Sequence, residues 1–403
     1  MVIVSEEEKY LKKRKRKAYL TSFIYHLFWI FPISKKKVVF TAFEGDGGYC
    51  CNPRYIAEEL LNNNDQELEQ VWLVNNMKKQ FPQGITKAKN TFLNRVYHLS
   101  TAKVWVDNSR KPYGTVKRKN QLYIQVWHAA IGFKPLGLFR GKLFPKMAYL
   151  VSEHDSNLVD YVISNSEWCT KLIPNMLLYN GEILKTGSPR CDNFFSKRKY
   201  IYRNLRSRYG IPQDAKIVLF APTFRGGSQK GDRQVFVEQS TIDFARMIQA
   251  LERKFGGSWF VFLRLHPQLA AQLDQYPLKN LTSNMIDVSQ ADDMNELAAA
   301  SDVLITDYSS SAFDVINMYM PVFLYADDLD QYTEERGQLM WDMYSLPFSV
   351  SKNNDELIEN ILIFDEEKYR MKIDDFSRTH GVLEDGHASE RIVEVIERFM
   401  NKD

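Results

Sequence analysis

Histidine, arginine and hydroxyl side chains follow several short apolar runs, where parallel strands would end. His128 comes after Leu122–Val126, and His266 comes after Trp259–Leu263. The proline after His266 favours an extended backbone, and alternation along such a chain puts Arg264 on the same side as His266. Either histidine alone also suits a structural place at the edge of a core. Their equivalent positions favour a ligand site.

A cluster of hydroxyl groups follows a third apolar run. Thr306-Asp307-Tyr308-Ser309-Ser310-Ser311 stands between Val303–Ile305 and an expected helix. Hydroxyls and backbone N–H groups at a helix start can cradle an anion, although one serine would suffice as a cap. Arginine suits bidentate phosphate contacts, with a surface ion pair as its alternative role. The run that begins Pro222-Thr223-Phe224-Arg225 offers a hydroxyl and a guanidinium after another apolar run, and Arg190 supplies a further guanidinium.

The fingerprints of several other sites are missing from the sequence. The turn 45–48 is not G-x-G-x-x-G, and no G-K-[ST] loop occurs. The four cysteines form no C-x-x-C pair, which disfavours a cysteine zinc site and fits a reducing compartment. Asp328 and Asp330 form a D-x-D string, but so short a pattern arises by chance. No metal site is therefore assigned.

Strands and helices are expected to alternate along the chain. Expected strands cover 38–43, 71–74, 103–106, 122–126, 161–164, 217–220, 259–263, 303–305 and 321–324. Expected helices cover 54–61, 91–99, 167–172, 199–209, 241–255, 294–300, 311–318 and 388–400, and Asn52 is expected to cap the first of these. The alternation predicts two α/β units with parallel sheets, with ligands beyond the carboxyl ends of the strands.

The charge of the chain is concentrated at its N-terminus. Residues 1–37 carry a net +7, whereas the remaining residues carry −4. The apolar stretch Ala18–Ile33 after Lys9–Lys17 lacks a signal-peptide cleavage site and is too short to span a bilayer. A basic amphipathic helix on an anionic membrane surface is favoured, with an intramolecular packing helix as the alternative. Basic charge confined to one arm, without a recognition motif, disfavours nucleic-acid binding.

An ordered set of motifs over roughly residues 38–395 resembles the CDP-glycerol glycerophosphotransferase family of teichoic-acid and capsule synthesis. The motifs are Trp127-His128, Gly187–Asp192, Ala221–Arg225, Arg264–Pro267, Thr306–Ser310, Tyr325–Tyr332 and Asp385–Arg391. The resemblance implies a GT-B architecture of two Rossmann-like, doubly wound domains facing a cleft. The expected parts are a basic amphipathic membrane segment (1–37), an acceptor domain (38–200), a CDP-alditol donor domain (201–390) and a C-terminal helix (391–403).

The resemblance implies transfer of glycerol phosphate from CDP-glycerol to a hydroxyl of a lipid-linked saccharide or growing polyol-phosphate chain, releasing CMP. It makes His128 and His266 the catalytic histidines, with His128 as the candidate general base. The implied donor-binding residues are Trp127, Arg190, Pro222, Thr223, Arg225, Arg264, Thr306, Ser309, Ser310 and Asp314. Ala129-Ala130 departs from the family's usual Gly-Thr. The absence of a long N-terminal extension favours a primase-like or short capsule member.

Three alternatives to this function stay open. The donor could be CDP-ribitol, the chain could be a nucleotide-sugar glycosyltransferase of the GT-B class, or it could be a nucleotide-binding membrane scaffold without turnover. No cofactor beyond the donor is implied. A divalent-metal requirement, the oligomeric state and the number of units added are left open. The expected location is peripheral, on the cytoplasmic face of the cell membrane.

Overall fold

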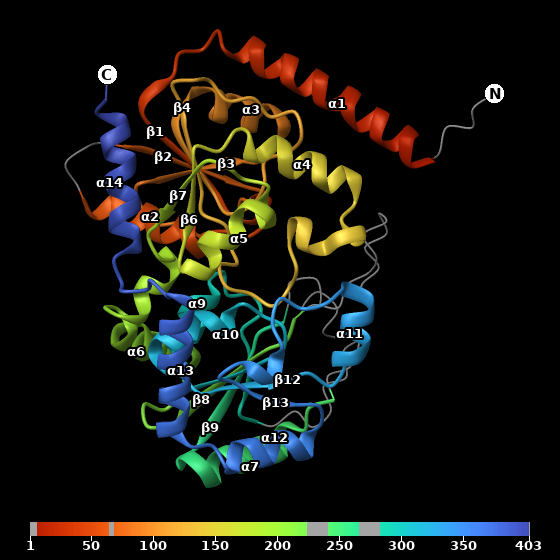
Figure 1. Ribbon diagram of the computed structural model, residues 1–403. Coiled ribbons are helices and arrows are strands. Elements are labelled where there is room, and N and C mark those ends of the chain that lie inside the picture. The colour runs from red at the N-terminus through yellow and green to blue at the C-terminus, as the bar shows by residue number, and fades with distance from the viewer. Residues whose placement is uncertain (1–5, 64–67, 224–240, 266–282, 403) are drawn as a thin grey trace. The chain divides into compact units, whose positions relative to one another are not determined.

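The computed structural model describes residues 6–63, 68–223, 241–265 and 283–402, which form two compact α/β units. Unit 1 comprises residues 1–130, 136–192 and 383–403, and unit 2 comprises residues 131–135 and 193–382. Each unit is built on one parallel sheet (Figure 1), which confirms the expected fold class. The division follows Asp192 rather than residue 200, and the C-terminal segment belongs to unit 1 rather than standing apart.

The sheet of unit 1 has seven parallel strands in the order β3-β2-β1-β4-β5-β6-β7. Their bounds are β1 Ser34–Thr41, β2 Glu69–Val74, β3 Ile85–Lys89, β4 Ala102–Asp107, β5 Leu122–Gln125, β6 Tyr161–Ser164 and β7 Glu182–Lys185. The strand order reverses between β1 and β4. In open parallel sheets, ligands bind beyond the strand ends at such a reversal.

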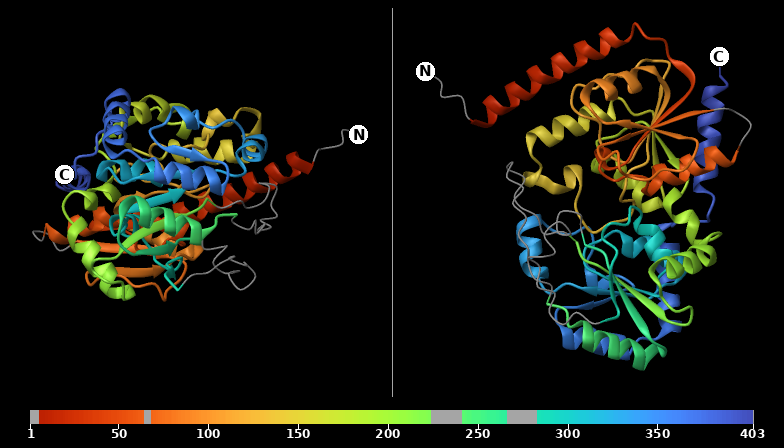
Figure 2. Two further views of the ribbon diagram at one scale, coloured as in Figure 1. Left: turned by 90° about the horizontal axis from the view of Figure 1, so that it is seen from below. Right: turned by 180° about the vertical axis from the view of Figure 1, so that it is seen from behind.

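Helices cover both faces of this sheet because successive strand residues point to opposite sides. They are α2 Cys51–Asn62, α3 Phe92–Thr101, α4 Lys146–Ser156, α5 Glu167–Leu177 and α14 Ala388–Met400. Val38 and Phe40 pack with α2 and α14 on one face, whereas Val39 packs with α3 on the other. The C-terminal helix lies beside α2 in both views of Figure 2.

The N-terminal helix α1 (Glu6–Phe28) packs on unit 1 through its second half, against α3. Ala18 and Tyr25 are buried there. Ser22 Oγ donates to the carbonyl of Gly114 at 2.9 Å, and Arg118 Nη2 donates to the carbonyl of Phe28 at 3.2 Å. One face of α1 is therefore part of the fold of unit 1. No helix of the described residues is both long and apolar enough to cross a membrane.

The sheet of unit 2 has six parallel strands in the order β10-β9-β8-β11-β12-β13. The strands are β8 Lys216–Ala221, β9 Trp259–Leu263, β10 Met285–Asp287, β11 Val303–Thr306, β12 Val322–Tyr325 and β13 Ser349–Ser351. The helices are α6 Arg198–Tyr209, α7 Phe244–Phe255, α9 Met294–Ala299, α10 Ser311–Asp314, α11 Leu329–Arg336, α12 Asn354–Leu362 and α13 Glu366–His380. The order reverses between β8 and β11.

Residues 131–135 are a short excursion of the chain into unit 2, beginning three residues after His128. Phe133 packs against Phe313, with ring centroids 4.9 Å apart, and its carbonyl accepts from the N–H of Met340 at 2.8 Å. The indole of Trp341 donates to the carbonyl of Gly132 at 3.2 Å. The segment after the His128 turn is thus anchored by both packing and hydrogen bonds.

Candidate active site

His128 stands on a sharp turn just past the carboxyl end of β5. Trp127, which precedes it, has φ +34°, a left-handed conformation that is costly for a residue with a side chain. Its backbone N–H donates to Gln125 Oε1 at 3.0 Å. Strained backbone persists only where its surroundings over-determine it, and such residues cluster at functional sites.

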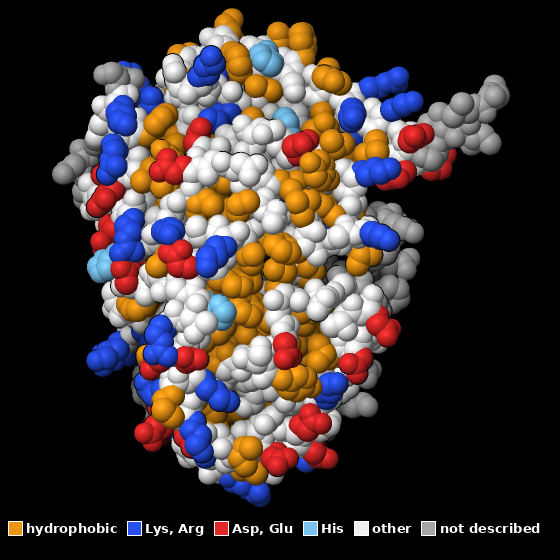
Figure 3. Space-filling model, in the orientation of Figure 1, with side chains coloured by type: hydrophobic (Ala, Val, Ile, Leu, Met, Phe, Trp, Pro, Cys, Tyr) orange, Lys and Arg blue, Asp and Glu red, His pale blue; other side chains and the backbone are white. Residues whose placement is uncertain are grey.

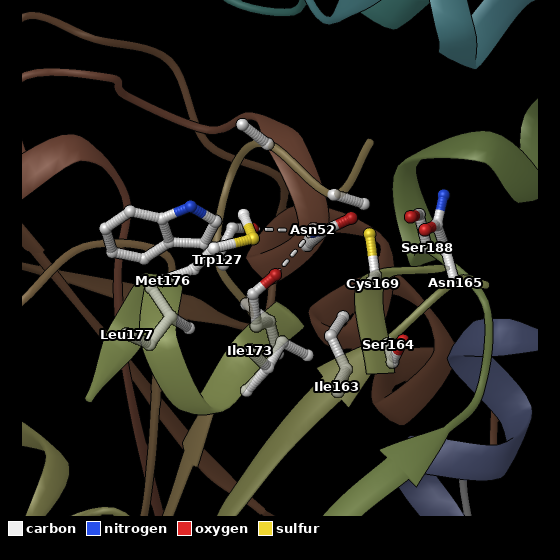
Figure 4. A pocket seen from close by; sticks show the side chains of 13 residues that line it. Asn52, Trp127, Ile163, Ser164, Asn165, Cys169, Ile173, Met176, Leu177 and Ser188 are labelled. Atoms are coloured by element: carbon white, nitrogen blue, oxygen red, sulfur yellow. Dashed lines mark hydrogen bonds between the residues drawn. The ribbon is translucent and has the colours of Figure 1, made fainter. Parts of the chain in front are cut away.

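The side chain of Asn52 holds this turn from α2. Its Nδ2 donates to the carbonyls of Val126 and Trp127, both at 2.7 Å (Figure 4). Its Oδ1 accepts the backbone N–H of Arg190 at 3.0 Å. Asn52 therefore does not cap the helix as the sequence suggested. The cap residue is Cys50, which makes no side-chain cap bond, and the amide of Asn52 is used across the fold instead.

Arg190 lies behind the same turn. Its side chain is buried, and Nη1 donates to the carbonyl of His128 at 2.7 Å. The sequence placed Arg190 among the donor-binding residues. In unit 1 its guanidinium contacts the backbone of the candidate base.

A hydrogen bond and contacts with two aromatic rings help to fix the ring of His128. Its Nδ1 lies 2.8 Å from the carbonyl of Asn108, just past β4. Because a carbonyl can only accept, Nδ1 carries the proton, and in the neutral ring Nε2 carries the lone pair. The rings of Trp127 and Phe43 lie 4.7 and 5.3 Å from the imidazole. The neutral ring held in this way is the tautomer in which Nε2 can accept a proton.

A small pocket opens beside the turn within unit 1 (Figure 4). Its lining is mostly apolar and includes Ala129 and Ala130. The other lining residues are Asn52, Val126, Trp127, Ile163, Ser164, Asn165, Cys169, Ile173, Met176, Leu177 and Ser188. The indole Nε1 of Trp127 and the Oδ1 of Asn165 are buried without a hydrogen-bond partner among the described residues. These two atoms place one hydrogen-bond donor and one acceptor, both without a partner among the described residues, at the edge of an apolar pocket.

A buried polar network supports the strands beneath His128. Lys111 Nζ lies 2.5 Å from Asp107 Oδ2, with both side chains buried. Asp155 accepts from the N–H of Lys111 at 2.9 Å and from Tyr123 Oη at 3.1 Å. Burial, with a smaller contribution from the nearby Asp107 and against the opposing effect of Lys111, raises the pKa of Asp155 to about 7. The network ties α4 to the ends of β4 and β5.

In unit 2, the expected donor residues gather where β8 and β11 end. Asp307 is buried, and both of its carboxylate oxygens accept the backbone N–H of Thr223, at 2.9 and 3.0 Å. Thr306 Oγ1 donates to the carbonyl of Ala221 at 2.6 Å. These bonds join the two strands at the reversal of the sheet. The hydroxyl of Thr306 is thereby used in a bond between strands, whereas Pro222 and Thr223 lie half-buried at the strand end.

The serine cluster follows directly. Ser309 Oγ lies 2.9 Å from Ser311 Oγ and accepts the N–H of Ser311 at 3.3 Å. Ser309 and Ser310 are half-buried, and Asp314 is buried. The expected helix over 311–318 is one α-helical turn, α10, followed by a 3-10 segment. The α-helix that follows the serines is therefore shorter than the sequence suggested.

Arg264 follows β9, the neighbour of β8, and its Nη1 donates to the carbonyl of Ser289. His266 and Arg225 lie outside the described residues. The described part of the chain contains no group of three or more His, Cys, Asp or Glu side chains that could hold a metal ion. Within the D-x-D string, Asp328 accepts from Tyr308 Oη at 2.9 Å, and Asp330 Oδ2 lies 3.4 Å from Lys352 Nζ.

Several residues of this site were absent from the sequence-based set. Asn108 directly follows β4 and Phe43 comes two residues after β1, so the strand-end rule would have found them. Asp307 was seen only as part of the hydroxyl run. Asn52 carries no local signal for its contact, because its partners are more than 70 residues away.

Two units, each with a doubly wound parallel sheet and polar groups at its strand reversal, define a GT-B-like fold. The chain belongs to the CDP-glycerol:poly(glycerophosphate) glycerophosphotransferase family, whose model matches residues 23–398. It is similar to the solved wall teichoic acid polymerase TagF, with a TM-score of 0.79, 26% identity and 98% of each chain covered.

Two relatives show how the lengths compare. The chain is 28% identical to a teichoic acid poly(glycerol phosphate) polymerase of Bacillus subtilis over 381 residues, which are 91% of this chain but 49% of that protein. It is 29% identical to a teichoic acid glycerol-phosphate transferase of Staphylococcus aureus, with 90% of this chain and 93% of the relative covered. The chain thus spans about half of the first relative and nearly all of the second.

Proposed function

We propose that this protein transfers glycerol phosphate from CDP-glycerol to a hydroxyl group in teichoic-acid synthesis, releasing CMP. Family membership and the names of its relatives support this chemistry. The observation that carries it is the His128 imidazole, held with Nδ1 on the Asn108 carbonyl beyond the end of a parallel sheet. A base in this tautomer can take a proton from an acceptor hydroxyl through Nε2.

In the proposed reaction, the acceptor oxygen attacks the phosphorus that carries glycerol. A new P–O bond forms, the P–O bond to CMP breaks, and the hydroxyl proton goes to His128 Nε2. CMP leaves with the electron pair of the broken bond. Such a transfer depends mainly on positioning and on stabilising negative charge.

The donor would be bound by unit 2. Ser309, Ser310 and Thr223 offer hydroxyls at the reversal of its sheet, which suits a diphosphate. Arg264, Arg225 and His266 would supply positive charge to the diphosphate and to the departing CMP. Asp314 is buried beside Asn295, whose Nδ2 lies 3.5 Å from its Oδ2. Asp314 would thus act by supporting the serine segment.

The test is CMP release by the purified protein with CDP-glycerol and a soluble acceptor, with CDP-ribitol and UDP-sugars in parallel. His128→Ala and His266→Ala should each abolish release while the chain stays folded. His26→Ala, an exposed histidine on α1, should retain it. Wild-type turnover by His128→Ala would refute the assignment of the base. Release of UDP from a UDP-sugar instead would favour a glycosyltransferase.

We further propose that α1 holds the enzyme on an anionic membrane at the cytoplasmic face, beside a lipid-linked acceptor. The face of α1 turned away from unit 1, continuing past the helix, exposes Tyr19, Leu20, Phe23, Leu27 and Ile30, the last with 83% of its surface accessible. Lys12–Lys17 precede this apolar row along the helix. Figure 3 shows basic side chains toward one end of the helix and apolar ones toward the other. Both features suit an anionic interface.

Flotation with phosphatidylglycerol-containing vesicles tests this proposal. Leu20→Ser combined with Phe23→Ser and Leu27→Ser should abolish flotation without removing the buried Tyr25. Ile363→Ser with Met371→Ser, which changes exposed apolar residues of unit 2, is the control and should leave flotation intact. Equal flotation of both variants would rule out the anchor.

A further inference from the structure

Backbone strain is concentrated around His128. Six non-glycine residues of the described chain have positive φ. Leu178 and Tyr319 simply follow the ends of helical segments. The other four, Phe43, Glu44, Cys51 and Trp127, come from the loop after β1, the start of α2 and the turn after β5.

The strained turn is held at nearly every polar group of its backbone. Asn52 binds the carbonyls of residues 126 and 127, Gln125 binds the N–H of Trp127, and Arg190 binds the carbonyl of His128. The loop after β1 is held in the same way, since the N–H of Phe43 donates to Asn108 Oδ1 at 2.7 Å. Asn108 therefore links the Phe43 backbone to the His128 ring.

Asn52 occupies the centre of this arrangement. It is 2% exposed, and both polar atoms of its amide make hydrogen bonds. Nδ2 donates to the turn, and Oδ1 accepts the backbone N–H of Arg190. Asn52 thus fixes both the turn and the backbone of the arginine whose guanidinium holds the His128 carbonyl. Removing its Nδ2 would free two buried carbonyls together.

We propose that Asn52 is a positioning residue that holds His128 in the Nδ1-protonated, proton-accepting geometry. The inference rests on the proposed function, because it assigns Asn52 a role in the same proton transfer. Asn52 itself does not touch the reacting atoms. It acts by keeping the Trp127 turn in a conformation that the chain would otherwise leave.

The informative variant is Asn52→Asp. The carboxylate keeps the size of the amide and the acceptor for Arg190, but it places an oxygen against two carbonyl oxygens. A displacement of a catalytic group by about 1 Å can cost on the order of 100-fold in rate. We expect kcat for CMP release to fall by about that factor. The KM for CDP-glycerol should change less than about 3-fold, because the hydroxyls proposed to bind the diphosphate, those of Thr223, Ser309 and Ser310, lie in unit 2.

Gln121→Glu is a matched control. Gln121 is also buried, and its Nε2 donates to two backbone carbonyls, those of Leu99 at 2.6 Å and Ala102 at 2.5 Å. Its Oε1 accepts the N–H of Arg118 at 2.9 Å. It precedes β5, whereas the His128 turn follows that strand. Gln121→Glu should lower the melting temperature comparably while leaving kcat and its pH profile within about 3-fold of wild type.

A second readout does not depend on turnover. In ¹⁵N-histidine spectra, with the His128 signal assigned from its loss in His128→Gln, wild type should show the Nδ1–H tautomer. Asn52→Asp should shift this tautomer, whereas Gln121→Glu should not. If Asn52→Asp fails to fold, Arg190→Lys, which removes the guanidinium bond to the His128 carbonyl, should lower kcat in the same direction.

The outcomes separate the two proposals. No CMP release by wild type would refute the proposed function, while the tautomer measurement would still decide the role of Asn52. An unchanged tautomer and kcat in folded Asn52→Asp would overturn the positioning role. Equal losses of kcat in Asn52→Asp and Gln121→Glu would overturn it too, because the effect would then reflect stability alone.

Discussion

The buried carboxyl of Asp155 should make a pH-dependent contribution to the stability of unit 1, and Asp155→Asn should remove that contribution. The carboxyl group is 3% exposed, and its Oδ1 accepts hydrogen bonds from the Lys111 backbone and from Tyr123 Oη. Burial raises its pKa from 3.8 to about 7. The amide oxygen of Asn can accept the same two hydrogen bonds and carries no charge at any pH.

The sign follows from proton binding. Between pH 3.8 and about 7 the native carboxyl keeps a proton that the unfolded chain releases, so the native state is progressively destabilised as the pH rises through this range. From pH 5 to the native pKa of about 7 the change is about two units, or about 3 kcal/mol at 1.4 kcal/mol per unit. Above the native pKa the loss is complete. Below pH 5 most of the stability is retained.

Denaturant unfolding at pH 5 and pH 8 measures the effect. The free energy of unfolding of Asp155→Asn, relative to that of wild type, should be about 3 kcal/mol higher at pH 8 than at pH 5. Asp365→Asn is the control, because Asp365 is an exposed cap of α13 whose pKa is lowered by hydrogen bonds to Lys368. Asp365→Asn should show no increase in the free energy of unfolding, relative to wild type, between pH 5 and pH 8. A difference between Asp155→Asn and wild type that is equal at the two pH values would refute the reasoning.

Two further substitutions test packing in each unit. Gly114→Ala should loosen α1, because Gly114 has φ +95° and a Cβ there would lie 2.5 Å from the carbonyl oxygen of Ala18. Faster tryptic cleavage at Lys12–Lys17 is expected, and an unchanged rate would contradict the docking of α1. Arg206→Met should destabilise unit 2 by about 3 kcal/mol, because it removes the 3.1 Å ion pair between Nη2 of this fully buried arginine and Asp302, which would keep its hydrogen bond from the Ile217 N–H. A loss below about 1 kcal/mol in urea unfolding would count against it.

Central strands were the most predictable part of the fold. β6 and β9 begin and end where the sequence places them, as does the helix α14. Strands covered on both faces read as continuous apolar runs, so their limits are visible locally. Val303–Thr306, buried throughout, is such a strand.

The four strands that sequence reasoning missed are the four edges of the two sheets: β3, β7, β10 and β13. Their sequences, such as Ile-Thr-Lys-Ala-Lys for β3, mix polar and apolar residues and lack a buried run. An edge strand has one neighbour only and carries charged side chains that discourage further pairing. Nothing local distinguishes it from a loop, because its partner strand determines that it is extended.

The residues of the site also differ in how far local sequence patterns reveal them. The rule that ligands lie beyond strand ends selected His128, Thr223, Arg264 and the serines, because that rule needs only local patterns. The prediction for Asn52 was wrong because the local pattern around it was misleading. Asn before Pro at the start of an apolar run predicts a helix cap. The amide is instead used on the turn after β5, where it holds the strained backbone of Trp127 next to His128.

A conflict between local preference and observed contact is therefore informative. Asn52 leaves the first turn of α2 without its side-chain cap, and Trp127 adopts a backbone that tryptophan disfavours, yet both conflicts meet at one histidine. Sequences usually agree with their folds at every level, and departures concentrate where function requires them. This convergence points to the His128 turn independently of any family motif. Capping rules alone would have assigned Asn52 to helix stability rather than to the proposed positioning of His128.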